Sequence, residues 1–282
     1  MSSFRELVIK YEKLCEKSGV PSETVMAFLV ELSQEERYNL YVHFEEEVPE
    51  ELGVKFEEGM NRILNHEPMA HVLGYSWFYG YKMISNQNAL IPRVETEELC
   101  AQILSRIDEH FPEGSVDAVD VGTGSGAIAI TLVKEEARVN MKASDISEEA
   151  LLVAKENANI NEAEVEFVCG DMLKPFIERG DKFDVLVCNP PYIPEEEEME
   201  DSVVDYEPNI ALFGGDDGLK FYREVFRDCK KVLKDKAFMA FEMGWNQKEA
   251  MSALVKEYLG EVDFEIIKDM NGKDRMLFVY FL

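Results

Sequence analysis

The sequence predicts an open α/β domain on a mostly parallel sheet, preceded by a small helical domain and a short β-hairpin linker. From about residue 115 onward, short apolar runs alternate with segments of helical periodicity, as in parallel strands joined by right-handed crossovers. In residues 1–66, apolar residues recur at helical spacing, as Leu7, Tyr11 and Leu14 do. A length of 282 residues suits a catalytic domain of about 150–200 residues with a smaller partner domain.

Charge and composition narrow the classes of function. The chain carries 29 Lys and Arg against 57 Asp and Glu, a net charge of −28 that repels phosphate backbones, so we expect no stable nucleic-acid binding. The five cysteines form no C-x-x-C pair, which predicts a reducing cytoplasm and no metal site. No apolar run approaches the ~18 residues of a membrane span, and the N-terminus does not read as a signal peptide. We expect a cytoplasmic protein without a membrane partner.

The helical domain and the linker that follows it differ in their sequence patterns. Residues 1–66 contain no catalytic set, so we interpret them as a helical domain for packing or for docking a substrate. Residues 67–94 interleave aromatic residues with Gly74 and Gly80, which predicts a β-hairpin linker. Thr96 is then expected to cap the next helix.

The remaining domain, residues 95–282, is predicted to alternate strands with helices. These elements are expected over residues 116–121, 126–137, 139–145, 147–160, 165–171, 183–192, 218–233, 237–243 and 247–259. Two final strands flank Asn271-Gly272, a dipeptide suited to a tight hairpin turn, so the last strand should run antiparallel to its neighbour. A sheet that binds a nicotinamide dinucleotide does not ordinarily end in this way.

A glycine-rich loop follows the first strand of this domain and opens a helix. Gly122, Gly124 and Gly126 alternate there with Thr123 and Ser125. Glycines let a ligand approach the backbone and the amides at the helix start, so the loop predicts a nucleotide-like cofactor. Two alternatives stay open, because the loop also fits the dinucleotide pattern G-x-G-x-x-G/A and a purely structural turn.

Two further strand ends carry candidate cofactor residues. Asp145 ends the next strand, where a carboxylate can accept hydrogen bonds from both hydroxyls of a ribose. The alternative is that Asp145 caps the helix that begins near Ser147. Asp171 and Met172 follow the third strand, where the carboxylate could meet an adenine amino group while the methionine packs on the ring.

The tetrapeptide Asn189-Pro190-Pro191-Tyr192 closes an apolar strand at the sheet edge where open α/β folds bind ligands. Two prolines remove two amide donors and fix φ, which leaves nearby carbonyls free for a ligand. A planar NH2 group would be held by the Asn189 side chain and the Pro190 carbonyl, with Tyr192 against its face. A rigid proline turn is the structural alternative, but it explains neither the flanking Asn and Tyr nor the location.

These motifs together resemble a known family. The loop DVGTGSGAIAI, Asp145 and NPPY are similar to S-adenosylmethionine-dependent methyltransferases that act on amide or exocyclic amino nitrogens. The segment HEPMAHVLGYSWFYGYKMISNQNALIPRVETEEL and the stretch over residues 206–218 resemble the HemK family, the release-factor glutamine methyltransferases. The resemblance covers essentially the whole chain. It implies a Rossmann-like seven-stranded methyltransferase sheet with an antiparallel terminal hairpin, plus a small N-terminal helical domain.

The resemblance also implies an activity and a set of residues. The implied reaction is methyl transfer from S-adenosylmethionine to N5 of the glutamine in the Gly-Gly-Gln motif of class 1 peptide chain release factors. The residues implied for the cofactor are Gly122, Thr123, Gly124, Ser125, Gly126, Asp145, Asp171, Met172 and Asn189. Those implied for the glutamine are Asn189, Pro190, Pro191 and Tyr192, of which Asn189, Pro190 and Tyr192 are the catalytic candidates.

Phe78 is a further candidate, to shape the glutamine entrance, with a packed linker aromatic as the alternative. Two departures qualify the resemblance. Arg93-Val94-Glu95 replaces the family's usual Arg-Pro-Glu, and Arg93 and Glu95 could order the linker or form an ion pair. Met172 stands where the family often has an aromatic residue, so adenine packing is expected to be looser.

The expected mechanism follows from the weakness of the nucleophile. An amide nitrogen delocalises its lone pair into the carbonyl, so binding must orient it toward the methyl group, and alignment alone can supply much of the barrier reduction. Acceptors at Asn189 and Pro190 would also stabilise positive charge that grows on nitrogen. None of the four histidines is assigned as a base.

Four alternatives remain from the sequence. A sister branch of the family methylates a ribosomal-protein glutamine. An adenine-N6 DNA methyltransferase would also use NPPY, but the net charge disfavours it. A nicotinamide dehydrogenase fits the glycine spacing only. A non-catalytic partner of translation is disfavoured by the presence of both motifs.

Overall fold

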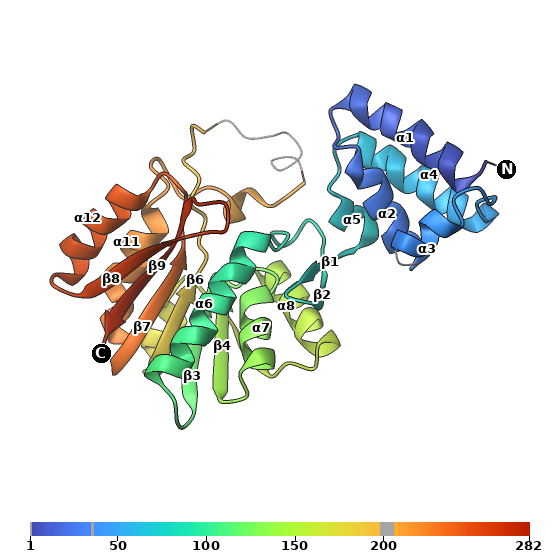
Figure 1. Ribbon diagram of the computed structural model, residues 1–282. Helices are drawn as coiled ribbons and strands as arrows, with labels where there is room; N and C mark the ends of the chain where they lie inside the picture. The colour runs from blue at the N-terminus through green and yellow to red at the C-terminus, as the bar shows by residue number, and fades with distance from the viewer. Residues whose placement is uncertain (1, 35–36, 198–205) are drawn as a thin grey trace. The chain divides into compact units, whose positions relative to one another are not determined.

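The computed structural model describes residues 2–34, 37–197 and 206–282, in two compact units (Figure 1). The first unit contains the described residues up to Tyr75, together with Tyr206. The second contains those from Ser76 to residue 197 and from Glu207 to the C-terminus. Within these described ranges, no helix has the length and apolar character that crossing a bilayer requires.

The first unit is helical. Its helices are α1 (Phe4–Ser18), α2 (Glu23–Ser33), α3 (Arg37–Val42), α4 (Glu50–Leu64) and α5 (Met69–Leu73). Phe28 and Phe56 are fully buried at the centre of its core. The predicted helical domain is therefore present. Helix α5 lies in the range assigned to the linker, because Met69, Val72 and Leu73 pack against the helical core.

A two-stranded hairpin follows, formed by β1 (Tyr75–Phe78) and β2 (Tyr81–Ile84). Helix α6 spans Val94–His110 and has Arg93 at its N-cap. The predicted cap at Thr96 is wrong: its amide donates to the Arg93 carbonyl within the first turn, and its hydroxyl donates to a distant carboxylate.

Seven strands form the sheet of the second unit, in the order β5-β4-β3-β6-β7-β9-β8. They are β3 (Val116–Val121), β4 (Val139–Asp145), β5 (Val165–Cys169), β6 (Phe183–Cys188), β7 (Leu233–Glu242), β8 (Asp263–Lys268) and β9 (Asp274–Phe281). Strand β9 runs antiparallel to both of its neighbours, β7 and β8, while the other pairings are parallel, which confirms the predicted seven-stranded sheet with an antiparallel terminal hairpin. The final turn is wider than the two residues predicted, because the Asp269 amide donates to the Lys273 carbonyl and the Gly272 amide donates to the Asp269 carbonyl.

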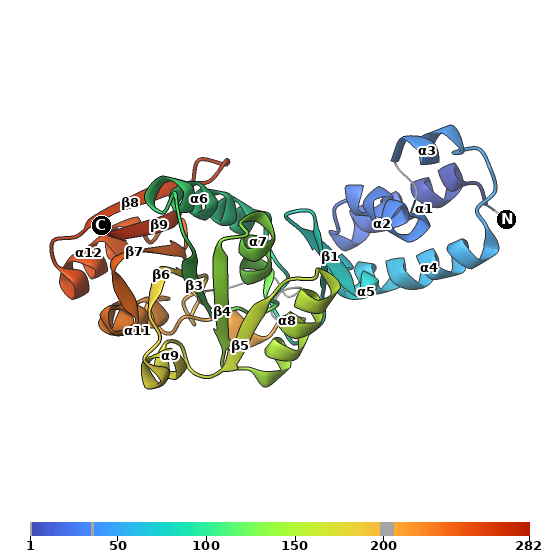
Figure 2. The same ribbon diagram turned by 90° about the horizontal axis from the view of Figure 1, so that it is seen from below.

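Helices cover both faces of this sheet. They are α7 (Ala127–Glu135), α8 (Glu148–Ile160), α9 (Lys174–Arg179), α11 (Lys220–Asp228) and α12 (Lys248–Leu259), with short 3₁₀ turns η1 (Asn209–Ala211) and η2 (Cys229–Lys231). Figure 2 shows α6 and α7 on one side and α9 and α11 on the other. Val185 and Val187 pack in the core between the sheet and helices α6 and α7. Leu186 and Cys188 pack in the core on the side of α9, α11 and α12. This period-2 alternation buries both faces of β6.

Asn157 of α8 links the hairpin to the glycine-rich loop. Its side chain is fully buried, and its Nδ2 donates to the Ser125 carbonyl at 2.9 Å. Its Oδ1 accepts from the Ile84 amide of β2 at 2.6 Å. Both ends of one buried amide are thus satisfied by two segments far apart in sequence.

Candidate active site

The carboxyl ends of β3, β4 and β6 border a cavity of about 310 Å³. Strand β3 pairs with β4 on one side and β6 on the other, so the cavity lies at the point where strand order reverses. The predicted site residues that line it are Gly122, Thr123, Gly124, Ser125, Asp145, Asp171, Met172, Asn189 and Pro191. Gly126, Pro190, Tyr192 and Phe78 do not.

The glycines of the loop have two different roles: Gly122 and Gly124 leave open space, and Gly126 packs against a helix. Gly122 and Gly124 have φ of 74° and 55°, and a Cβ on either would meet no atom within 4 Å. Positive φ calls for glycine at both, and the open space leaves the backbone accessible to a ligand. Gly126 instead serves packing, since its Cβ would lie 3.1 Å from the Ala154 Cβ of α8.

Asp145 faces the cavity with its carboxylate held by two backbone amides. Its Oδ2 accepts from Gly124 N at 2.8 Å and its Oδ1 from Ser147 N at 2.9 Å. Ser147 is the residue that caps α8, through its own hydroxyl. Burial raises the pKa of Asp145 against these two hydrogen bonds. The carboxylate is therefore preorganised at the cavity wall.

Asp120 lies beneath the loop and was not singled out by the sequence. It is fully buried, and its Oδ2 accepts a 2.6 Å hydrogen bond from the Thr123 hydroxyl. Its Oδ1 has no partner among the described residues. Burial raises the pKa of Asp120 to about 7.

The cavity is also lined by Asp171 and Met172, which follow β5, and by several apolar residues that were not predicted. The Asp171 carboxylate is paired with Lys174, and the Met172 carbonyl accepts from the Ser144 hydroxyl at 3.2 Å. The wall is completed by Ala89, Leu90, Ile128, Ile210 and Phe221. Ala89, Leu90 and Ile210 come from loops and a short 3₁₀ turn, where no periodicity in the sequence could indicate them.

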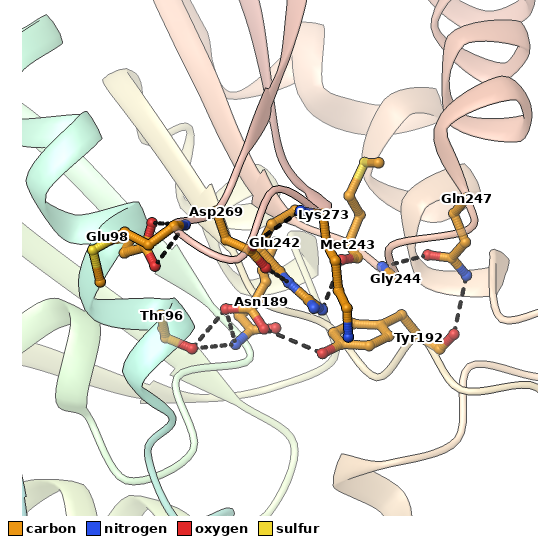
Figure 3. A network of polar contacts seen from close by, with 12 residues as sticks. Thr96, Glu98, Asn189, Tyr192, Glu242, Met243, Gly244, Gln247, Asp269 and Lys273 are labelled. Atoms are coloured by element: carbon orange, nitrogen blue, oxygen red, sulfur yellow. Dashed lines mark hydrogen bonds and ion pairs between the residues drawn. The ribbon is translucent and has the colours of Figure 1, made fainter.

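Asn189 reaches the cavity with one end of its amide occupied (Figure 3). Its Nδ2 donates to Glu242 Oε2 at 3.1 Å and to Thr96 Oγ1 at 3.3 Å. The Thr96 hydroxyl in turn donates to Glu242 Oε2 at 2.6 Å. Within the described part of the chain, neither Asn189 Oδ1 nor the Pro190 carbonyl has a hydrogen-bond donor.

Glu242, at the end of β7, is the residue that sequence reasoning missed. It is 2% exposed, and its Oε1 accepts from the Tyr192 hydroxyl at 3.2 Å. Burial raises the pKa of Glu242, opposed by its hydrogen bonds and by Arg275. The pKa of the Tyr192 phenol is raised by burial and by the Glu242 charge, so it remains a neutral donor. The available signal was an acid within the apolar run 237–243.

The backbone of the tetrapeptide contacts Gln247, Gly214 and Gly218. The Tyr192 carbonyl accepts from Gln247 Nε2 at 3.0 Å, a contact drawn in Figure 3. A Cβ on Gly214 would lie 2.4 Å from the Pro191 carbonyl oxygen, and one on Gly218 would lie 2.2 Å from that of Tyr192. The glycines of the 206–218 stretch thus allow this close approach.

Two placements differ from the sequence-based expectations. Phe78 is 1% exposed and packs in the core with Leu99 and Ile103, so it does not shape the cavity entrance. Its position on β1 turns it into the sheet-facing core. Arg93 pairs with the buried Glu207, which also accepts from Ile91 N at 3.0 Å. The ion pair therefore orders the loop before α6, without Glu95.

The cavity fits S-adenosylmethionine on its own chemistry. Open space faces two positive-φ glycines, a preorganised carboxylate at Asp145 suits ribose hydroxyls, and an apolar wall suits adenine. A methyltransferase small domain is matched by residues 100–206. A methyltransferase from Pyrococcus furiosus has the same fold, with a TM-score of 0.53 at 18% identity over 80% of this chain and 98% of that one. Fold and site define an S-adenosylmethionine-dependent methyltransferase.

The particular family follows from the curated relatives. A release factor glutamine methyltransferase of Bacillus cereus is 43% identical over 244 residues, 86% of each chain. That of Staphylococcus aureus is 34% identical over 98% of this chain and 99% of its own. A PrmC N-terminal domain is matched by residues 6–74. The chain belongs to the release factor glutamine methyltransferase family, which removes the dehydrogenase alternative.

Proposed function

We propose that this enzyme methylates N5 of the glutamine in the Gly-Gly-Gln motif of class 1 peptide chain release factors. The observation that carries the proposal is one cavity that combines the glycine loop with the Asn189 amide oxygen, which has no donor among the described residues. The names of the relatives support the substrate.

The cofactor half of the cavity is assigned to five residues. The Gly122 and Gly124 backbone would face the methionine part, Asp145 the ribose, and Asp171 and Met172 the adenine. The chemistry that S-adenosylmethionine supplies when bound is a methyl group on a positively charged sulfur. Thr123 and Ser125 complete the loop, and Gly126 supports it by packing.

The substrate half is assigned to the tetrapeptide. Asn189 Oδ1 and the Pro190 carbonyl would accept the two N–H groups of the glutamine amide, and Pro191 lines the cavity beside them. Tyr192 does not line the cavity, and its hydroxyl donates to Glu242. Two fixed acceptors orient the nitrogen lone pair, and both bonds strengthen as positive charge grows on nitrogen. No described residue that lines the cavity is a histidine, and the proton can leave the methylated nitrogen to water after transfer.

The reaction is tested by methyl transfer from labelled S-adenosylmethionine to a purified release factor. The matched control is the same factor with the motif glutamine changed to alanine. Label on the first alone supports enzyme, substrate and site together. Label on neither, with cofactor binding intact, contradicts the substrate and redirects the assay to ribosomal-protein glutamines.

We also propose that the helical unit docks the release factor. A surface groove borders α2 and α4, and its lining combines the apolar Val20, Met26, Ala27, Val30 and Ile63 with Glu23, Glu31 and Glu67, which suits a protein segment that carries apolar side chains. Ala27 is exposed, so Ala27→Arg fills the groove without disturbing the core. We expect KM for the release factor to rise about tenfold with kcat unchanged.

Val54→Arg is the matched control for that variant. Val54 is 51% exposed on α4 and does not line the groove. It adds the same charge to the same unit, so an equal rise in KM for both variants would contradict groove docking.

The five free cysteines and the net charge of −28 support a cytoplasmic enzyme that does not bind nucleic acid stably.

A further inference from the structure

We propose that Glu242 is a positioning residue that fixes which end of the Asn189 amide faces the substrate. The inference rests on the proposed function, because its consequence concerns recognition of a glutamine amide. Glu242 does not line the cavity and touches no proposed ligand; it acts through Asn189.

The orientation of an asparagine amide is decided by its partners. Its oxygen and its NH2 group have nearly the same shape, and a half-turn of the amide exchanges them. Here both partners of the inner end are acceptors. A carboxylate at Glu242 can only accept, and the Thr96 hydroxyl gives its single hydrogen to Glu242, so its oxygen accepts from Asn189.

The reversed amide would fail at both ends. Its oxygen would lie 3.1 Å from Glu242 Oε2 with no hydrogen between them, at a site where Glu242 is 2% exposed. An unpaired contact between two buried acceptors is costly in a low-dielectric surrounding. At the other end, an NH2 group would face the NH2 group of the glutamine. The buried carboxylate thus selects the acceptor that the substrate requires.

Charge, and not shape, makes this selection. A neutral group at position 242 could donate to the Asn189 oxygen as readily as it accepts from the nitrogen. Burial raises the pKa of Glu242, and Glu95 adds to this, whereas the Thr96 and Tyr192 hydroxyls and the nearby Arg275 favour the carboxylate. Glu242→Gln keeps the shape but lets either orientation of Asn189 form a hydrogen bond.

The decisive measurement compares two release factors on wild-type enzyme and on Glu242→Gln. One carries the natural glutamine, and the other carries glutamate in its place and is used as a competitive inhibitor. In the wild type, two acceptors face the glutamate carboxylate and disfavour it. In Glu242→Gln, a turned Asn189 can donate to it, so the preference for glutamine should narrow about tenfold.

Turnover provides the second readout. We expect kcat of Glu242→Gln to fall about 10- to 100-fold, while the Kd for S-adenosylmethionine stays within about threefold. Asp184→Asn is the matched control, because Asp184 is another buried acid, at the opposite end of β6, and should change neither the preference nor kcat.

A second variant protects the test against misfolding. If Glu242→Gln does not melt cooperatively, Thr96→Val removes one inner acceptor, keeps the carboxylate, and should narrow the preference by a smaller factor. An unchanged preference in the folded variants, even with reduced kcat, would overturn the inference and leave Glu242 a merely structural role. Failure of the wild type to methylate the glutamine factor would instead refute the proposed function, so the two failures are distinguishable.

Discussion

Strand β6 has a polar cluster at each end, and the two are built differently. At its start, the Asp184 carboxylate accepts a 2.7 Å hydrogen bond from Lys234 Nζ, and Lys234 also forms an ion pair with Asp117. At its end, Asn189 and Glu242 are joined through neutral donors. An exposed lysine can balance charge from many positions. Neutral donors with fixed directions specify geometry, so the comparison separates stabilising the fold from orienting a reacting group.

Asn189→Ala tests the end of the strand and should have the largest effect. Loss of a directional acceptor for the glutamine amide should lower kcat about 10²- to 10³-fold. The Kd for S-adenosylmethionine, measured by calorimetry, should rise far less. Unchanged kcat would contradict the role given to Asn189.

Gly218→Ala tests the support behind the tetrapeptide. Gly218 has φ of +71°, and a Cβ would lie 2.2 Å from the Tyr192 carbonyl oxygen. We expect a loss of about 3 kcal/mol in the free energy of unfolding, and a lower kcat because the tetrapeptide must move. Gly180→Ala is the control, since Gly180 has the same φ of +71° but open space around it. Equal losses would show that backbone strain alone is responsible.

Asp120→Asn tests a buried carboxyl at the same sheet edge, whose charge is stabilised by few hydrogen bonds. Its folded pKa of about 7 lies above the unfolded value of 3.8. Stabilisation from the protonated carboxyl is fully present below pH 3.8 and is lost as pH rises through 7. Between pH 5 and 8 the wild type should therefore lose about 2.5 kcal/mol of unfolding free energy that Asp120→Asn keeps. Parallel pH profiles in urea unfolding would contradict this.

Lys234→Met tests the start of the strand and should have the smallest effect. The Lys234 side chain is 36% exposed, so solvent screens its two ion pairs. We expect a loss of about 0.5–1 kcal/mol in unfolding free energy at low salt, less at high salt, and no change in kcat. A clear fall in kcat would mean that the two ends of β6 are coupled.

Local pattern was enough to predict the sheet and the residues at its strand ends. Asp145 and Asn189 each follow an apolar strand, and parallel strands bring such positions to one edge. Thr96 was assigned as a cap because local sequence offered no other partner. Its actual partner is 146 positions away, and such a pairing depends on sheet order.

Dependence on contacts distant in sequence also explains why the role of Glu242 was missed and why Phe78 was misplaced. Glu242 lies 53 positions from Asn189, on a strand that the sequence shows only as apolar. Phe78 belongs to an aromatic-rich hairpin, where alternation does not reveal which face meets the core. Gly214 and Gly218 were visible as part of a resemblance, but their steric reason required the position of the Tyr192 backbone.

Asn157 sets the lower limit for trimming the catalytic unit. The sheet itself begins at β3, and a fragment cut at α6 would contain every strand of it. Such a fragment would lose the Ile84 amide, which donates to the Asn157 oxygen two bonds from the amide nitrogen that holds Ser125. We therefore expect a fragment that starts ahead of β2 to hold the glycine-rich loop more firmly than one that starts at α6.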